Sequence, residues 1–282
     1  MASQELPIAA LLPIDPRYPR RLGELGKPPA TLWVVGRAPA GNERGVAMVG
    51  SRAATVKGCA RATEMAAVLG RSGWFVVSGG ALGIDAAAHQ GALQVGAATF
   101  AVLGCGVDVV YPDRHRSLFA RIAAAGGILS ELPPATPPRP GQFPVRNRLV
   151  AALGDAVLVV EADRMSGALI TAKLARKLGR LVLAVPGSAG TDQLIAAGAA
   201  DPVDDAHDVL ARLAGGPAKV AVVPEGLRPL CRALAAGADT PPGLAQKLGR
   251  PLPEVLGLLF EAELSGWVRR LPGGRFEVPH AN

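Results

Sequence analysis

The sequence predicts an α/β fold, a doubly wound and mostly parallel sheet with helices on both faces, followed by a small C-terminal domain. Three observations support this fold class. From Gly45 onward, short apolar runs alternate with longer segments rich in Ala and Leu, which is typical of a parallel sheet covered by helices. Near residue 214 the composition changes, and shorter helical patterns follow. The length of 282 residues is enough for one full α/β domain and a smaller second one.

Six apolar runs are the expected strands. They occupy residues 45–50, 74–79, 98–104, 126–131, 155–161 and 180–187. The segments between them have the composition of helices, which we expect at residues 57–71, 83–95, 114–125, 145–153 and 167–178. We therefore expect an α/β domain over residues 45–214, with residues 1–44 packing on its core as an N-terminal extension.

The C-terminal part has the pattern of a winged helix. We expect a linker at residues 215–225 and the domain itself at residues 226–282, with helices at 227–236, 242–248 and 252–262 and then a hairpin around a Pro-Gly-Gly turn. A recognition helix presents Arg, Lys, Asn or Gln to base edges, but the third helix offers Glu254, Glu261 and Glu263. We favour a protein-interaction or accessory role for this domain. Contacts with the nucleic-acid backbone remain possible for the wing arginines, which are Arg269, Arg270 and Arg275.

Composition restricts the class of partner. The formal net charge of +7 and the pI near 9.8 favour an anionic partner such as nucleic acid, although a uniformly basic proteome would give the same balance. We find no apolar run of about 18 residues for a membrane span and no signal-peptide pattern, so we expect a cytoplasmic protein without membrane contact. The three cysteines are far apart and form no CxxC or Cys/His pattern, which argues against a disulfide framework or a metal site.

Small residues follow nearly every expected strand. Gly50, Ser51 and Arg52 follow the first, and the second is followed by a turn that contains Gly79 and Gly80. The carboxyl ends of parallel strands form the ligand crevice of such sheets, and the following helices direct their positive dipole ends into it. The sequence therefore predicts an anion-binding crevice. The second turn lacks the GxGxxG fingerprint and the later acid of NAD or FAD proteins, and it lacks GK[ST] of a Walker A loop, so we expect no cofactor.

A proline-rich loop over residues 133–144 leads into the segment "GQFPVRNRLV". It places Phe143, Arg146, Asn147 and Arg148 at the start of a helix, close to the crevice. An arginine can simply pair with a carboxylate. Two arginines beside an aromatic ring instead suit single-stranded nucleic acid, because the charges follow the phosphates and the ring stacks on a base.

Several motifs together resemble the bacterial DNA-processing protein A family, known as DprA or Smf. They are "VGSRAAT", "SGGALGIDAAAH", "AVLGCGVDVVYP", "SELPP", "FPVRNRLVAAL", "VVEADRMSGALITAKLA" and "AVPGSAGTDQLIAAGA", and they cover about residues 15–210 in consistent order. The resemblance implies an extended Rossmann-like domain that binds and protects single-stranded DNA and helps to load RecA recombinase during natural transformation, as a competence protein without catalytic activity.

The resemblance also implies particular residues. By position, the DNA-binding region corresponds to Ser51 and Arg52, the glycines of the second turn and the loop from Phe143 to Arg148, with Ser166, Gly167 and Lys173 as candidate additions. The family forms homodimers, and the apolar residues Leu194 and Val209 near the end of the expected sheet are the candidate dimer contacts.

This sequence departs from the family pattern in places. Many relatives have an N-terminal helical domain before a "YP..L" segment, but here Tyr18 and Pro19 come almost at once, so we expect that domain to be absent. Relatives commonly have Tyr where this chain has Lys57, and Asn where it has Asp192. An inward-facing acid would weaken DNA binding, and we expect Asp192 to cap the following helix instead.

The alternative function is an enzyme. "PGSAGT" resembles the PGGxGTxxE loop of nucleotide 5′-monophosphate phosphoribohydrolases, whose chemistry needs a carboxylate shortly after the Thr. Here Asp192 stands directly after Thr191 and is displaced from that position. Asp85 and His89 lie four residues apart on one expected helix face and are a candidate acid/base pair, although such a pair more often caps a helix and fixes a turn. We therefore expect a binding protein without catalytic residues.

Overall fold

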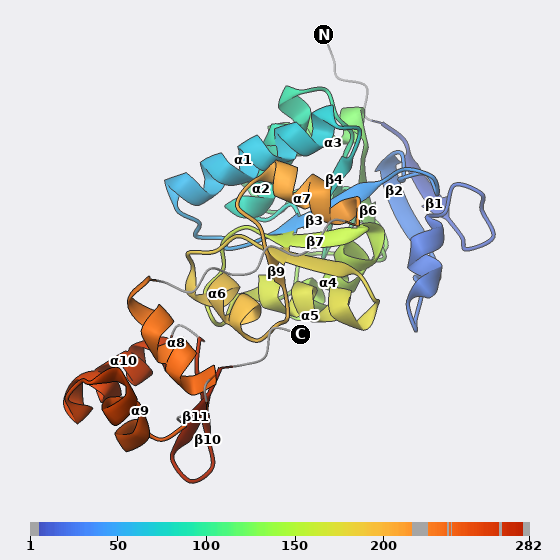
Figure 1. Ribbon diagram of the computed structural model, residues 1–282. Helices are drawn as coiled ribbons and strands as arrows, with labels where there is room; N and C mark the ends of the chain where they lie inside the picture. Colours follow the sequence, from blue (N-terminus) through green and yellow to red (C-terminus); the bar gives the residue numbers. More distant parts are fainter. Residues whose placement is uncertain (1–5, 216–224, 236, 238, 265–266, 279–282) are drawn as a thin grey trace.

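The computed structural model describes residues 6–215, 225–235, 237, 239–264 and 267–278 (Figure 1). A nine-stranded sheet of order β1-β2-β6-β5-β4-β3-β7-β8-β9 forms its centre. Pairing is parallel from β6 to β9 and antiparallel between β1, β2 and β6. The predicted fold class, a doubly wound and mostly parallel α/β sheet of the Rossmann-like kind, is confirmed.

The six predicted strands are β3 (Gly45–Val49), β4 (Phe75–Ser78), β5 (Thr99–Val102), β6 (Gly127–Ser130), β7 (Ala156–Val159) and β8 (Leu181–Ala184). Each is shorter than its apolar run, because the small residues at its carboxyl end form a turn. The sequence did not indicate β9 (Asp201–Pro202), which extends the sheet beyond β8. It also did not indicate that residues before Gly45 contribute β1 (Ile8–Leu11) and β2 (Leu32–Gly36) to the same sheet.

Alternate side chains of each central strand enter two different cores. In β3, Val46 and Met48 belong to one core, while Ala47 and Val49 belong to the other. Burial on both faces explains why the strands are continuously apolar instead of alternating.

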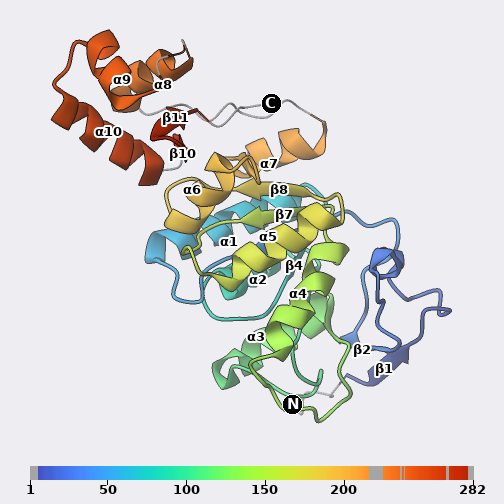
Figure 2. The same cartoon turned by 90° about the horizontal axis from the view of Figure 1, so that it is seen from below.

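Helices cover both faces of the sheet. One face is covered by α1 (Val56–Arg71), α2 (Ile84–Gln94), α3 (Arg116–Ala125) and α7 (Ala206–Leu213), and the other by α4 (Gln142–Leu153), α5 (Gly167–Lys177) and the 3₁₀ helix at Arg20–Glu24. Figure 2 shows α4 and α5 next to each other in front of the sheet. Helix α6 (Ala189–Ala196) follows β8. In the described part of the chain, no helix has both the length and the apolar character needed to cross a bilayer.

The C-terminal part has its own small core. Its elements are α8 (Arg228–Ala235), α9 (Pro241–Leu248), α10 (Leu252–Leu264) and the antiparallel pair β10 (Arg269–Leu271) and β11 (Arg275–Glu277), in the predicted order. Leu230, Leu244, Val255 and Phe276 are buried together there. The winged-helix assignment stays a prediction, and most of the expected linker, residues 216–224, lies outside the described residues.

Candidate nucleic-acid interface

The carboxyl ends of β5, β4, β3 and β7 lie next to one another at one edge of the sheet. The turn after β4 needs glycine for two reasons. Gly80 has φ 68°, a conformation that side-chain-bearing residues rarely adopt, and a Cβ on Gly79 would lie 2.5 Å from Nη2 of Arg146. This close approach brings α4, which carries Arg146, directly against the turn.

The chain's own carboxylate fills the turn after β4. Oδ2 of Asp85, in the first turn of α2, accepts hydrogen bonds from the N–H groups of Gly79 (3.1 Å) and Ala81 (3.2 Å). Burial raises the pKa of the Asp85 carboxyl, while the Arg146 charge and the turn N–H groups act in the opposite direction. The backbone N–H groups that the sequence suggested for a phosphate are therefore already bound.

The turn after β3 is closed in a similar way. Glu161, which follows β7, accepts hydrogen bonds from the N–H (2.9 Å) and the hydroxyl (2.6 Å) of Thr55 at the N-terminus of α1. Ser51, beside Gly50, is buried, its N–H donates to the carbonyl of Glu161 and its Oγ accepts from Ala53. The expected anion cradle is thus occupied by internal carboxylates at two of its turns, which leaves the side chains at the rim for an anionic ligand.

Arg146 lies beneath this rim. It is 5% exposed, and its Nη1 donates to the carbonyl oxygens of Gly79 (2.6 Å) and Val102. Burial lowers the pKa of its guanidinium to about 10, still well above neutral pH. Arg146 therefore remains a cation that joins β4, β5 and α4. Its burial argues against the predicted direct contact with DNA and makes it a positioning residue.

Three side chains form a stack at the exposed rim, which we call the Phe143 platform. The guanidinium of Arg52 lies 5.3 Å from the Phe143 ring centroid, and the Tyr111 ring lies 5.6 Å away on a tilted plane. Phe143 is half-buried over Gly104, whereas Arg52 and Tyr111 are exposed. The structure thus brings the predicted residues Arg52 and Phe143 together and adds Tyr111. The sequence analysis missed Tyr111, although an aromatic residue in the loop after the third predicted strand was a signal for it.

The side chain of Arg148, which the sequence places in the DNA-binding region, is bound internally. Its guanidinium forms an ion pair with Glu131, which follows β6, and donates to the carbonyl of Lys27 at 2.8 Å. Residues 146 and 148 are two positions apart in α4, so helical geometry turns their side chains to nearly opposite sides. Arg146 consequently faces the strand ends, and Arg148 faces the N-terminal segment.

The start of α5 supplies a helix end without an acidic cap. Nδ2 of Asn147 donates to the carbonyl of Gly167 at 3.4 Å, which links α4 to the first turn of α5. Ser166 caps this helix by accepting from the N–H of Ala168, and the first turn contains no acid. Lys173 is exposed on the same helix. The predicted residues Asn147, Ser166 and Gly167 are therefore close together, at a positive helix end open to solvent.

The predicted dimer contacts have different environments. Leu194 in α6 is partly buried against the core, and Val209 in α7 is 0% exposed within it. The side chain of Val209 therefore cannot contact a second chain without unfolding its surroundings. Only Leu194 remains a candidate contact.

The residues of the enzyme alternative are all engaged internally. His89 is buried, Nδ1 lies 2.7 Å from Oγ1 of Thr99, and burial lowers the pKa of its imidazole to about 3. Asp85 binds the turn after β4, and Asp192 accepts a hydrogen bond from the N–H of Gly187 (2.8 Å) just before α6. Asp85 and His89 are thus not placed to exchange a proton with a bound substrate. Among the described residues, no group of three His, Cys, Asp or Glu side chains is arranged to hold a metal.

A Rossmann-like sheet carries at its carboxyl edge an arginine–aromatic stack and a helix N-terminus without an acidic residue in its first turn. These features are typical of the class of α/β proteins that bind an anionic ligand. Comparison with known proteins specifies the family. The chain belongs to the DNA recombination-mediator protein A family, whose model matches residues 9–214. The resemblance read from the motifs is confirmed.

Curated relatives and solved structures agree with this family. The chain is 38% identical to Protein Smf of Escherichia coli over 98% of this chain and 79% of the relative, and 47% identical to Protein Smf of Synechocystis over 63% of this chain but only 46% of that relative. The X-ray structure of DprA from Streptococcus pneumoniae superimposes with a TM-score of 0.66 at 38% identity, covering 74% of each chain. A structure of DNA processing protein A from Helicobacter pylori, described for its single-stranded DNA binding mode, gives a TM-score of 0.66 at 32% identity, covering 74% of this chain and 97% of that one.

Proposed function

We propose that this chain binds single-stranded DNA at the carboxyl edge of its sheet and takes part in DNA processing without catalysing a reaction. The Phe143 platform is the observation that carries the proposal. A half-exposed aromatic ring beside the exposed side chains of Tyr111 and Arg52 suits stacking with a base of any sequence, and the arginine charge suits the adjoining phosphate. The Helicobacter pylori relative, described as a single-stranded DNA binder, supports the same ligand class.

Phosphates would reach the N-terminal end of α5, whose first turn contains no acidic residue, next to the platform. Ser166, Gly167 and Asn147 lie there, and Lys173 extends the positive charge along the helix. Gly50, Gly79 and Gly80 allow the close approach of neighbouring segments at this site, and Arg146 holds the turn that contains Gly79 and Gly80. Arg148 supports the N-terminal segment instead of the DNA.

The wider role follows from the family. We propose that the protein protects incoming single-stranded DNA and helps to load RecA during natural transformation, in the cytoplasm and as a homodimer. Residues 45–214 would form the DNA-binding domain with residues 1–44 as its extension, and residues 226–282 would form an accessory winged-helix domain after the linker at 215–225. The phosphoribohydrolase alternative is not favoured, since its candidate residues are bound internally.

Fluorescence anisotropy of single- and double-stranded oligonucleotides at several salt concentrations tests the proposal. We expect a preference for single strands that weakens with salt. Arg52→Glu should lower the affinity several-fold and reduce the slope of log affinity against log salt by about 0.7, the share of one phosphate contact on single strands. Arg71→Glu is the matched control, because Arg71 is exposed at the end of α1 and has no side-chain partner among the described residues. Equal behaviour of the two variants would remove the platform from the DNA site.

A further inference from the structure

The last helix of the C-terminal part, α10, exposes a row of large apolar side chains. Leu252, Leu256 and Phe260 are 41%, 46% and 62% exposed. They are four residues apart, so helical geometry places them in one row along the helix, which we call the α10 row. Val255 and Leu259, on another side of the helix, are buried in the small core. The α10 row therefore lies outside this core, and nothing in the described part of the chain covers it.

The surface around the α10 row suits the packing of a second helix. Side chains four residues apart form the ridges that fit into the grooves of a neighbouring helix. Gly257 lies beside the row, and a Cβ at this position would meet no atom within 4 Å. Glycine destabilises a helix interior relative to alanine, and neither a positive φ nor an internal contact requires it here. Its missing side chain leaves room for a partner to approach α10 closely.

One side of this surface is negatively charged. Glu254 and Glu261 are seven residues apart, so they share one side of the helix, and Gly257 lies between them and the α10 row. Both are exposed, and neither has an ion pair in the part of the chain that the structure describes. The helix itself contains no Lys or Arg, and the nearest basic residues in the sequence, Lys247 and Arg250, precede it. The two glutamates are therefore available to a cation from another molecule.

The wing arginines do not offset this charge. Each forms an ion pair with an acidic side chain: Arg269 with Glu277, Arg270 with Glu263 at 3.5 Å and Arg275 with Asp239 at 3.5 Å. Their charges are thus compensated within the C-terminal part, which weakens the case for phosphate contacts by the wing.

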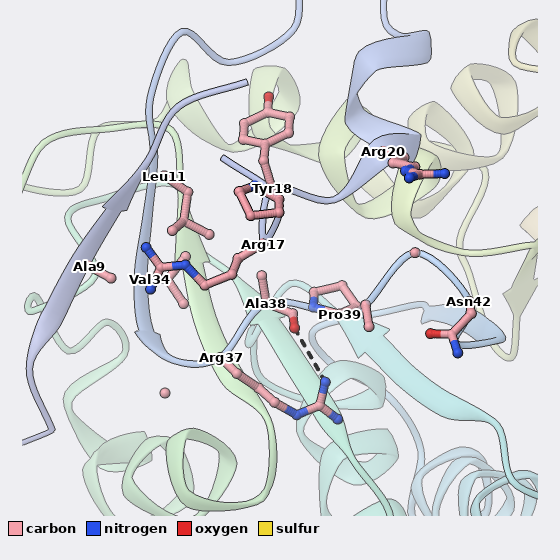
Figure 3. A pocket seen from close by; sticks show the side chains of 14 residues that line it. Ala9, Leu11, Arg17, Tyr18, Arg20, Val34, Arg37, Ala38, Pro39 and Asn42 are labelled. Carbon is pink, nitrogen blue, oxygen red and sulfur yellow. Dashed lines mark hydrogen bonds between the residues drawn. The ribbon is translucent and has the colours of Figure 1, made fainter. Parts of the chain in front are cut away.

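The shape of the α10 row excludes a small molecule as its ligand. Small-molecule sites are concave, whereas this row lies on the convex surface of a helix. A pocket of about 700 Å³ in this protein lies between the N-terminal segment and the loop that joins β2 to β3, where Ala9, Leu11 and Arg37 are among the lining residues (Figure 3). None of the residues that line it belongs to α10. A ligand of the row must therefore be a larger molecule with a surface of its own.

We propose that α10 docks an amphipathic helix of a partner protein. The apolar face of that helix covers the α10 row, and its Lys or Arg side chains pair with Glu254 and Glu261. The two glutamates repel the phosphates of nucleic acids and lipids. A second copy of α10 would add the same glutamates and no cation to pair with them. This inference does not depend on DNA binding at the Phe143 platform.

A synthetic helix of about 20 residues, with Leu on one face and Lys on the other, is the probe. Fluorescence anisotropy of the labelled Leu/Lys peptide with the full chain should show binding. Phe260→Ser should weaken it by about tenfold, because it removes the most exposed side chain of the α10 row. Glu261→Lys should weaken it several-fold, because a pairing charge is replaced by a repulsive one. Glu64→Lys is the matched control and should bind like the parent, since Glu64 is exposed in α1 without an ion pair among the described residues.

Two further variants extend the test. Leu256→Ser should repeat the effect of Phe260→Ser, and both should keep the circular dichroism of the parent because their side chains lie outside the core. A peptide with Glu in place of each Lys should bind more tightly to Glu254→Lys/Glu261→Lys than to the parent. Arg52→Glu should leave the affinity for the Leu/Lys peptide unchanged, so failure of the proposed DNA site is measured separately.

The inference is overturned if the Leu/Lys peptide does not bind, or if either Phe260→Ser or Glu261→Lys binds it like Glu64→Lys. It is also overturned if light scattering shows that Phe260→Ser converts a dimer of the parent into a monomer, since a second copy would then cover the α10 row. A loss of DNA affinity in Phe260→Ser would assign the row to nucleic acid and overturn the inference as well.

Discussion

Replacement of Arg146 by alanine separates a positioning role from a DNA-contact role. The guanidinium donates to the carbonyls of Gly79 and Val102 and faces the buried carboxylate of Asp85. Breaking a buried charge interaction of this kind costs about 3–5 kcal/mol, because the remaining charge is left without compensation. Since domains are stable by only about 5–15 kcal/mol, Arg146→Ala should lose a large share of the free energy of unfolding.

Urea unfolding followed by circular dichroism measures this loss, and Asp85→Asn supplies the comparison. The double variant Arg146→Ala/Asp85→Asn contains no uncompensated charge. Its loss of unfolding free energy should therefore be smaller than the sum of the losses in the two single variants, by about 0.5–3 kcal/mol. The structure predicts this coupling because both residues bind the same turn. Two results together would refute the positioning role: Arg146→Ala loses less than about 1 kcal/mol of unfolding free energy, and it reduces the salt dependence of DNA binding as the loss of a phosphate contact would.

Four further predictions concern other parts of the chain. The pKa of His89 is lowered to about 3 in the folded protein, so below about pH 6.5 the imidazole takes up a proton in the unfolded chain but stays neutral in the folded one. The free energy of unfolding should therefore fall by about 2 kcal/mol between pH 7 and pH 5. Urea titrations at both pH values should show a smaller fall for His89→Gln. Arg148→Met should lower stability through the lost Glu131 ion pair but leave the salt slope of DNA binding unchanged in anisotropy titrations, and a changed slope would return Arg148 to the DNA site. Deletion of residues 217–282 should leave most of the affinity for single-stranded DNA, and a loss beyond about tenfold would contradict the proposed location of the DNA site. Light scattering of the full chain should give twice the chain mass, and a monomer at high micromolar concentration would contradict the proposed homodimer.

The sequence was sufficient for the central sheet, but not for its antiparallel edge. Strands β3 to β8 are buried on both faces, so their apolar runs are unambiguous. By contrast, β1 joins the sheet by pairing with β2, and β2 pairs with β6, which lies almost a hundred residues further along the chain. That pairing depends on tertiary contacts that local patterns do not encode.

The candidate site was predicted only in part for a related reason. The pattern of Arg52, Phe143 and Asn147 predicted side chains at the carboxyl edge of the sheet, where the structure places them, but it could not show which N–H groups Asp85 and Glu161 occupy. The opposite orientation of Arg146 and Arg148 could be predicted from helical spacing, because residues three or four apart lie on the same face of a helix and residues two apart do not.

Phe143→Ala tests the central claim most directly, because it removes the ring of the platform without changing any charge. Anisotropy titration of a single-stranded oligonucleotide over a range of salt should show a loss of about 1–3 kcal/mol in binding free energy with a nearly unchanged salt slope, since stacking releases no counterions. A variant that folds normally by circular dichroism and binds single-stranded DNA like the parent protein would contradict the account, and the carboxyl edge of the sheet would then need a different ligand.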